Sequence, residues 1–309
     1  MRLAALTLVT LSTATLASQP SVPFIVEETG TIYQSFQAAV DAIGEGRGTI
    51  IVNGGTYSQC AVQRAGEITY RATKAGAAIF DGVACEGKAA LVLRGRSAEV
   101  EGIVFSNISV PDRNGAGIRL EAGTLTVRQS WFRDSEQGIL TASASDIALR
   151  VERSTFTGLG TCEGAGGCAH SIYAGDIGEL VVERSRFEAG TGGHYVKSRA
   201  ARNIVRDSSF DDSNGSGTNY MIDLPNGGGG AIVGNRFVQG RNKENWSAYI
   251  ALGAEGAGYS ANGLIIAGND ARGVLGLERE TTFLADWTGD PIDLRNNTLG
   301  TGLKAYERR

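Results

Sequence analysis

The middle of the chain repeats one short pattern of apolar and polar residues. In each copy two apolar residues stand two positions apart. A serine or asparagine lies three positions after the second apolar residue, and a phenylalanine lies two positions after that. Because side chains alternate between the two faces of a strand, this pattern predicts short, half-buried β-strands on either side of a turn. The copies end at Phe105 (a degenerate copy), Phe132, Phe156, Phe187, Phe210 and Phe237, with fainter copies at Asn269 and Asn296.

The spacing of these copies predicts a solenoid. From Phe105 to Phe237 the phenylalanines are separated by 27, 24, 31, 23 and 27 residues. A constant pattern at a variable interval indicates coils of fixed width joined by loops of variable length. We expect the phenylalanines to stack in the core, and the serines and asparagines to form a hydrogen-bonded ladder at a turn. The 44 glycines agree with many repeated turns.

A second pattern falls between copies of the first and predicts an outer face. Its centre is an aliphatic residue, as at Ile118, Ile172 and Val196. If these residues point inward, the residue after each points outward, and neighbours in that outward column lie about 4.8 Å apart. A slip of one residue at position 222 would instead turn Asp223 inward. The expected column is Arg119, Leu140, Tyr173, Lys197, Asp223 and Ala251, with Tyr195 and Arg199 beside Lys197.

Apolar residues recur at helical spacing over residues 32–45, which predicts a short amphipathic helix, and strands are predicted at 49–52 and 56–57. The stretch YQSFQAAVDAI, followed by GTIIVNGGTY, resembles the opening of the pectate-lyase-like superfamily of right-handed parallel β-helices. In that superfamily the helix caps the end of the stack, where the core and the strand edges would otherwise be exposed.

We therefore predict an all-β protein in which residues 19–309 form a single-domain right-handed parallel β-helix with a short N-terminal capping helix. Residues 1–18 contain one arginine, an apolar run and small residues at the end, which predicts a signal peptide cleaved near Ala17 or Ser18. We expect a secreted or periplasmic protein, and no later apolar run is long enough to span a bilayer.

The four cysteines fit an oxidising compartment. Cys60 and Cys85 are 25 residues apart, about one coil, so stacked coils could bring them together. Cys162 and Cys168 enclose a glycine-rich loop that a disulfide would close. The even count and the export signal favour these two pairs over four free thiols.

The charge of the chain excludes one class of partner. The formal net charge is −4 and charged residues make up 20% of the sequence, so no clustered basic surface for nucleic acid is expected. We also expect no membrane partner, and a monomer.

The outer face carries the candidate chemistry. Proteins of the fold that this chain resembles bind extended polysaccharides along an outer groove, and many that act on acidic sugars are lyases. Their β-elimination needs a cation at the uronate carboxylate, a base for the C5 proton and an acid for the leaving oxygen. A lysine among cationic and aromatic neighbours can act as the base, and an arginine suits a carboxylate. The predicted catalytic residues are Lys197, Tyr173, His194, Arg199 and His170.

The string Val196-Lys197-Ser198, with Asn203 and Arg206 after it, resembles the catalytic lysine region of polysaccharide lyase family six. That family acts on alginate and related uronans. The resemblance implies that Lys197 is the base, and it covers about one coil.

Two features of that family are missing here. Gly193 and His194 replace acidic residues that help to hold calcium, and the catalytic arginine has no counterpart in residues 222–226. We therefore predict no cofactor and assign no metal ligand; Ca²⁺ stays possible without its usual ligands, and histidine with lysine is not a usual zinc set. A histidine or Arg199 would neutralise the carboxylate instead.

Several assignments stay open on the sequence alone. Both histidines share the parity of the inward Ile172 and Val196, so core positions are an alternative to catalytic ones. Lys197 and Arg199 could be a solvated surface pair. The residues predicted to bind substrate are Arg119, Tyr195, Asp223 and Trp246.

The predicted function is a polysaccharide lyase that cleaves an acidic, uronate-containing polysaccharide. A uronan C5-epimerase would use the same proton abstraction, and a glycoside hydrolase would need paired carboxylates on the face. A non-catalytic carbohydrate-binding protein would use the same groove without turnover.

Overall fold

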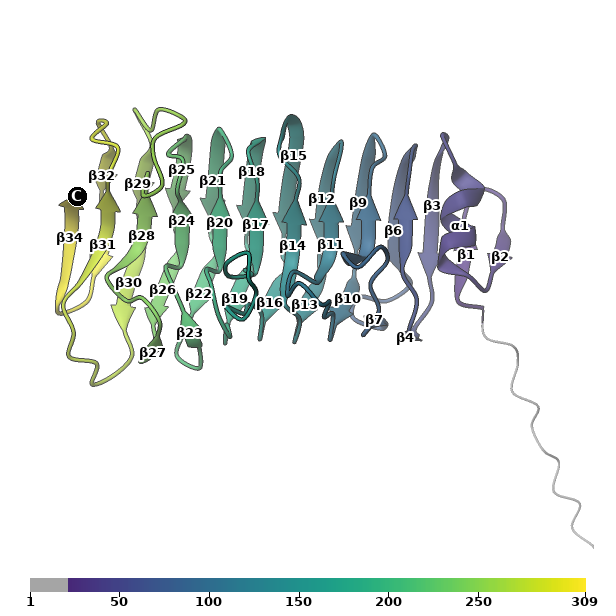
Figure 1. Cartoon of the computed structure of the whole chain (residues 1–309), viewed down its shortest axis with the longest axis horizontal. Helices are drawn as coiled ribbons and strands as arrows, with labels where there is room; N and C mark the ends of the chain where they lie inside the picture. The colour runs from purple at the N-terminus through teal and green to yellow at the C-terminus, as the bar shows by residue number, and fades with distance from the viewer. Residues whose placement is uncertain (1–21) are drawn as a thin grey trace, which may run out of the picture.

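The chain winds into an elongated stack of coils (Figure 1). Strands of successive coils pair in parallel to form three long sheets, here called sheets A, B and C. The computed structural model describes residues 22–309, and the signal peptide predicted at residues 1–18 lies outside them. The prediction of an all-β, right-handed parallel β-helix with one short helix is confirmed.

Sheet A has 12 strands and begins with antiparallel pairing, because β1 runs opposite to both β2 and β3. Its strands in spatial order are β2 (Thr31–Tyr33), β1 (Phe24–Val26), β3 (Arg47–Val52), β6 (Glu67–Ala72), β9 (Ser97–Glu101), β12 (Thr124–Arg128), β15 (Ala144–Glu152), β18 (Ile177–Glu183), β21 (Arg202–Arg206), β25 (Gly229–Val233), β29 (Ile265–Ala267) and β32 (Asp293–Arg295).

Sheet B has 10 strands and carries the phenylalanine column. Successive rings from Phe105 to Phe237 stack with centroids 4.8–5.1 Å apart, as predicted. The strands are β4 (Gly55–Tyr57), β7 (Ala78–Asp81), β10 (Ile103–Ser106), β13 (Trp131–Arg133), β16 (Thr155–Thr157), β19 (Arg186–Glu188), β22 (Ser209–Asp211), β26 (Arg236–Gln239), β30 (Asp270–Gly273) and β33 (Thr298–Leu299).

Sheet C also has 10 strands and supplies the outer face predicted to carry the chemistry. Its strands are β5 (Ala61–Gln63), β8 (Ala89–Leu93), β11 (Ala116–Leu120), β14 (Gln137–Thr141), β17 (Ile172–Ala174), β20 (Val196–Ser198), β24 (Ile222–Leu224), β28 (Ala248–Leu252), β31 (Thr281–Asp286) and β34 (Leu303–Arg308). A separate small sheet pairs β23 (Ser216–Thr218) with β27 (Asn242–Lys243).

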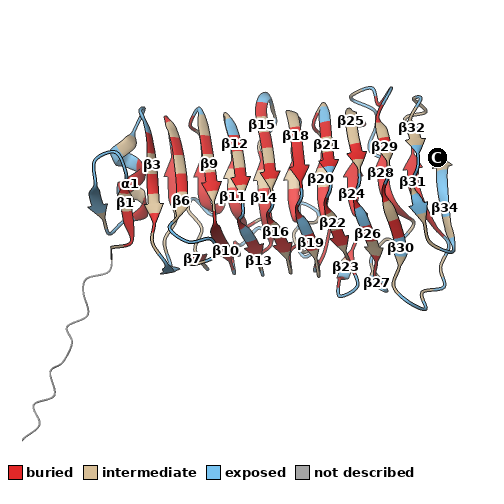
Figure 2. Ribbon diagram, turned by 180° about the vertical axis from the view of Figure 1, so that it is seen from behind, coloured by how far each residue is buried: buried red, intermediate tan, exposed pale blue. Residues whose placement is uncertain are grey.

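The predicted polar ladder lies at the turn between sheets A and B. The backbone N–H of Ser154 donates to Ser185 Oγ at 3.2 Å, and that of Ser185 donates to Ser208 Oγ at 3.1 Å. The residues before these serines, such as Arg153 and Arg184, have φ near +46° and turn the chain sharply. The serine hydroxyl of one coil therefore satisfies a buried backbone N–H of the coil before it. The buried apolar residues form one continuous core along the stack (Figure 2).

The N-terminal cap differs in part from the prediction. Helix α1 spans Phe36–Ile43, begins after the N-cap Ser35 and ends at Gly44. It closes the first coil by burying Phe36 and Val40. The expected start at residue 32 is wrong: Ile32 lies in β2 and is 52% exposed, because β1 and β2 form a hairpin at this end.

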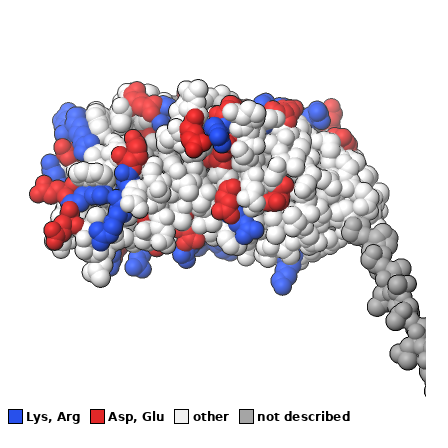
Figure 3. All heavy atoms as spheres, turned by 60° about the horizontal axis from the view of Figure 1, so that its bottom comes forward, with Lys and Arg blue, Asp and Glu red and all other residues white. Residues whose placement is uncertain are grey.

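Both predicted disulfides are present, Cys60–Cys85 between coils and Cys162–Cys168 across a loop. Between residues 22 and 309, no helix is long and apolar enough to cross a membrane. On the face shown in Figure 3, acidic and basic side chains lie interspersed. Ion pairs such as Arg128–Glu99 and Arg206–Glu183 join neighbouring coils of sheet A.

Candidate active site

The predicted outer column of sheet C is confirmed by the strand register. Arg119 pairs with Leu140, Leu140 with Tyr173, Tyr173 with Lys197, Lys197 with Asp223 and Asp223 with Ala251. No slip occurs at Asp223. Three candidate side chains, Tyr173, Lys197 and Asp223, therefore stand on consecutive rungs of one sheet.

Lys197 is the centre of this group. Its Nζ lies 2.6 Å from Glu255 Oε1, 3.4 Å from Asp223 Oδ2 and 5.9 Å from the centroid of the Tyr173 ring. Only 12% of the lysine side chain is exposed. An amine with a buried stem and two carboxylates at its head is held in one position on the outer face.

Arg199 lies two residues after Lys197, directly beyond the end of β20. Its Nε donates to Tyr173 Oη at 3.0 Å, and its Nη1 donates to Asn226 Oδ1 at 2.6 Å. Its Nη2 contacts the second oxygen of Glu255. The guanidinium is therefore oriented from three sides. Burial alone would lower the pKa of Arg199, but the partners Tyr173 and Glu255 outweigh that effect and raise it.

Glu255 is the site residue that the sequence reasoning missed. It lies in the glycine-rich loop after β28 and bridges Lys197 and Arg199 with its two oxygens. Burial would raise the pKa of Glu255, but hydrogen bonds from both cations more than offset this and lower it. The loop reads as a turn in sequence, and no pattern in the chain tells which rung its side chain reaches.

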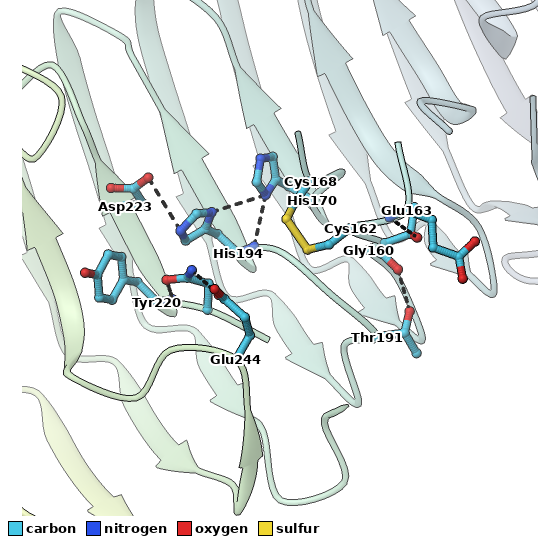
Figure 4. Close-up of a disulfide and its surroundings, with 12 residues drawn as sticks. Gly160, Cys162, Glu163, Cys168, His170, Thr191, His194, Tyr220, Asp223 and Glu244 are labelled. Carbon is cyan, nitrogen blue, oxygen red and sulfur yellow. Dashed lines mark hydrogen bonds and ion pairs between the residues drawn. A yellow bond between two sulfur atoms is a disulfide. The ribbon is translucent and has the colours of Figure 1, made fainter. Parts of the chain in front are cut away.

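His170 and His194 form a buried pair beside this cluster (Figure 4). The His194 backbone N–H donates to His170 Nδ1 at 2.9 Å, and the two Nδ1 atoms are 3.2 Å apart. His194 Nε2 lies 3.6 Å from Asp223 Oδ2, and the His170 ring meets the Tyr173 ring edge-on. The pair is thus buried, but it packs against the outer column rather than in the phenylalanine core.

Burial decides the charge of the two histidines. It lowers the pKa of His170 to about 3, with the Lys197 charge as a second cause. The pKa of His194 is lowered well below its usual value, again by burial first and then by the His170 and Lys197 charges. Both rings are therefore neutral near pH 7, and neither supplies a cation for a carboxylate.

Asp223 is buried on the rung next to Lys197, as its register partner in β24. Its burial raises the pKa of the carboxyl to about 6, against the opposing effect of Lys197. Oδ2 faces Lys197 and His194, whereas Oδ1 has no hydrogen-bond partner among the described residues. With 3% of the residue exposed, Asp223 is placed to hold the lysine from the next rung rather than to meet a polymer directly.

The expected position of Tyr195 on the outer face is wrong. Tyr195 is buried in the core against Phe187 and Phe210, and its hydroxyl donates to Asp212 Oδ1 at 2.7 Å. Strand alternation begins only at Val196, because Tyr195 occupies the corner where the chain turns into β20. A corner residue does not follow the parity of the strand.

Two other predicted substrate-binding residues stand apart from the cluster. Arg119 lies two rungs from Tyr173 and forms an ion pair with Glu121 at 3.6 Å. Trp246 is 44% exposed near the start of β28, stacks with Arg279 and lines a cavity of about 390 Å³. In the part of the chain that the structure describes, neither residue shares a hydrogen bond or ion pair with Lys197 or Arg199.

The donor set does not fit a calcium site. Asp223 and Glu255 are the carboxylates of the cluster, and each already contacts the Lys197 amine. Over residues 22–309, no three His, Cys, Asp or Glu side chains converge as metal ligands. Calcium prefers several carboxylate and carbonyl oxygens around one point, which these residues do not offer.

Comparison with known proteins shows the fold alone. No protein-family model and no curated protein sequence matches the chain. The crystal structure of an alginate lyase from Paenibacillus sp. str. FPU-7 superposes with a TM-score of 0.63 at 17% identity, covering 88% of this chain and 94% of that one. ORF18 of Geobacillus virus E2 superposes with a TM-score of 0.50 at 13% identity, covering 88% of this chain and 56% of that one. The chain is thus similar in fold to a polysaccharide-cleaving enzyme over nearly the whole length of both proteins.

Proposed function

We propose that this protein is a polysaccharide lyase that cleaves a uronate-containing polysaccharide by β-elimination. The observation that carries the proposal is the pair of cations Lys197 and Arg199, which hold one carboxylate between them on an outer face beside Tyr173. β-Elimination needs a neutralised carboxylate, a base and an acid within a few ångströms of one sugar ring. These three side chains supply those parts.

The proposed reaction begins when the uronate carboxylate binds Arg199, which withdraws charge and makes the C5 proton more acidic. Unprotonated Lys197 takes the C5 proton through Nζ and becomes an ammonium ion. The C5–H electron pair forms the C4=C5 double bond, and the C4–O bond breaks. Tyr173 gives its hydroxyl proton to the leaving oxygen.

The geometry at Arg199 supports Tyr173 as that proton donor. The Arg199 Nε–H points at Tyr173 Oη, so it stabilises the phenolate left after proton transfer. The ammonium proton of Lys197 returns to the phenolate through water, since Tyr173 and Lys197 are register neighbours. This resets both groups for the next cycle.

Fold and covalent structure give independent support. The alginate lyase described above has the same architecture over 94% of its length, and alginate is a uronate polymer. Two disulfides fit a secreted or periplasmic protein, which would meet such polymers outside the cell. The signal peptide at residues 1–18 and the monomeric state are parts of the same proposal.

A glycoside hydrolase is the second candidate, because two carboxylates flank Lys197. Asp223 has a pKa raised to about 6 by burial, whereas the pKa of Glu255 is lowered by Lys197 and Arg199 despite its burial. Such a split is typical of an acid and base pair in glycoside hydrolysis. Both carboxylates are nevertheless engaged by cations, which favours the lyase.

The deciding experiment measures the absorbance of 4,5-unsaturated uronate while the mature protein acts on a panel of uronate polymers. Wild type should produce the absorbance, and Lys197→Ala should abolish it with the fold intact by circular dichroism. Reducing ends without unsaturation would identify a hydrolase. A changed C5 configuration by NMR without chain cleavage would identify an epimerase, and binding without any product a carbohydrate-binding protein.

A further inference from the structure

The Glu255 carboxylate occupies the place that the proposed function gives to the substrate. One oxygen contacts Lys197 Nζ at 2.6 Å, and the other contacts Arg199 Nη2. A uronate carries the same chemical group and, in the proposed reaction, binds Arg199 in the place where Glu255 lies. Glu255 and a bound uronate carboxylate therefore cannot both hold this position.

The two cations keep their positions without help from Glu255. Arg199 is oriented by Tyr173 through Nε and by Asn226 through Nη1, which leaves Nη2 directed at the carboxylate. Lys197 keeps Asp223 beside it at 3.4 Å. If Glu255 withdraws, a prebuilt anion site with two donors remains.

The backbone of the segment that carries Glu255 is held in place, and the Glu255 N–H itself donates to Pro225 O at 3.1 Å, so displacement is a rotation of the side chain. The segment is tied down on one side by the Gly253 N–H donating to Leu224 O, and on the other by the Tyr259 N–H donating to Asn226 O. Between these ties lie Ala254, Glu255, Gly256, Ala257 and Gly258, all small apart from the glutamate. The glutamate side chain is 45% exposed, so it can rotate into solvent without opening the core.

We infer that Glu255 is an internal substitute for the substrate carboxylate, which closes the Lys197–Arg199 subsite in the free protein and must be displaced by an acidic sugar. This inference rests on the proposed function in taking the ligand to be a uronate. A ligand with its own carboxylate restores the ion pair at Arg199 after displacement, whereas a neutral sugar leaves this guanidinium without an anion.

Displacement also changes the surroundings of the proposed base. Once a substrate carboxylate sits on Arg199 and Glu255 has left, the closest anion of Lys197 is gone and Asp223 at 3.4 Å is the one that remains.

The test compares affinities for a saturated alginate tetrasaccharide by titration calorimetry. All proteins carry Tyr173→Phe so that the ligand is not cleaved, and they differ by Glu255→Gln or by the control Glu278→Gln. Glu278 is exposed, and its substitution removes the same charge from a distant surface position. Cellotetraose is the neutral ligand. In proteins that retain Tyr173, the Michaelis constant for alginate is measured with the same two glutamate variants.

We expect Glu255→Gln to bind the acidic tetrasaccharide at least fivefold more tightly and to lower the Michaelis constant in parallel, because the internal competitor is gone. Glu278→Gln should stay within twofold of its parent. In the parent protein cellotetraose should bind more weakly than the acidic tetrasaccharide, because it carries no carboxylate to replace Glu255.

Unchanged or weaker binding of alginate by Glu255→Gln overturns the inference, as does the absence of binding by every protein. Unsaturated product with an unchanged affinity overturns this inference alone and leaves the lyase intact. Tighter binding by Glu255→Gln without unsaturated product from any protein that retains Tyr173 overturns the lyase and leaves Glu255 as a carboxylate substitute in a binding protein. Loss of chain cleavage on Glu255→Gln, with no unsaturation in wild type, identifies Glu255 as a hydrolase base and overturns both.

Discussion

Four charged side chains meet at Lys197 and balance one another. Lys197 and Arg199 are cations, Glu255 is the exposed anion, and Asp223 is the buried one. The buried pair is the costly part, because a carboxyl in this position loses hydration that a single amine at 3.4 Å restores only in part. An arrangement that costs stability without a binding role would be unusual on an outer face.

Tyr173→Phe tests the proton donor at this scale. The substitution removes the hydroxyl that accepts from Arg199 and should lower kcat by about 100-fold or more, with a small change in the Michaelis constant. Initial rates of unsaturated uronate formation measure it. Tyr306→Phe, which removes a hydroxyl that donates to Asp286 in the C-terminal coils, is the matched control and should keep the wild-type rate. A Tyr173→Phe enzyme that turns over normally rules the donor out.

His170 predicts a pH dependence of stability. Its folded pKa of about 3 lies below the usual value of 6.5, so the neutral ring stabilises the fold above pH 6.5 and this contribution is lost as the pH falls toward 3. The groups that set this pKa are Lys197, Glu255 and Arg199, with burial as the main cause.

Between pH 7 and pH 4.5, wild type should lose about 2–3 kcal/mol of unfolding free energy from this source. In His170→Gln that share of the pH dependence should be absent, although the variant is less stable at pH 7. Urea unfolding at both pH values measures the difference. Parallel pH profiles for the two proteins would show that His170 does not resist protonation.

At the scale of strands, the phenylalanine column supplies many of the largest fully buried side chains of the core. Phe187 lies between Phe156 and Phe210 at 4.8 Å from each and is fully buried. Phe187→Ala should cost about 3–5 kcal/mol, because it opens a cavity that stiff neighbouring coils cannot fill. Trp131→Ala, on the exposed side of the same sheet, should cost less than about 1 kcal/mol. Guanidinium unfolding compares the two, and equal losses would contradict a stacked core.

The strands are predictable because each carries its own signal. Alternation, the turn serine and the phenylalanine recur locally, so aligning the repeats is enough to place the column from Arg119 to Ala251 on one face. The β1–β2 hairpin escapes prediction because Ile32 fits a helical stripe and a strand equally well. Tyr195 is misplaced by the alignment because parity fails at corners.

Glu255 shows where sequence reasoning ends for the site. Lys197 lies in β20 and Arg199 directly follows that strand, while Tyr173 is the register partner of Lys197. The repeat alone therefore places these three side chains close together. Glu255 arrives through a loop 56–58 residues later in the chain, and the path of a glycine-rich loop depends on contacts that no periodicity encodes.

At the scale of the whole molecule, the two disulfides should contribute unequally. Cys60–Cys85 closes a 25-residue loop between coils, whereas Cys162–Cys168 closes one of 6 residues. By the loop-entropy relation their removal should cost about 3.5 and about 2 kcal/mol, respectively. Paired Cys→Ser variants in thermal unfolding measure both, and a larger loss from the shorter loop would contradict this order.

Stability should also vary along the stack. The first coil is capped by α1, while β34 pairs only with β31 and most of its residues are exposed. Coils that contact one neighbour open more readily than coils that contact two. Amide hydrogens of β34 should therefore exchange at least about tenfold faster than those of β20. Uniform protection from β17 to β34 would show that the stack unfolds only as a unit.

The polar ladder and the phenylalanine column give the coils between Phe105 and Phe237 nearly the same upper and lower surface. A gene duplication or deletion of one whole coil would therefore leave both surfaces matched, and the stack could lengthen or shorten without a new core. Where the event falls decides its chemical effect. For the proposed lyase, an event before β14 would change only how many sugar units the face can contact. Between β17 and β20 it would move Tyr173 one rung, about 4.8 Å, from Lys197 and would end the proposed proton transfer. If the proposal holds, the length of polymer bound can therefore diverge freely in this architecture, whereas the spacing of Tyr173 and Lys197 cannot.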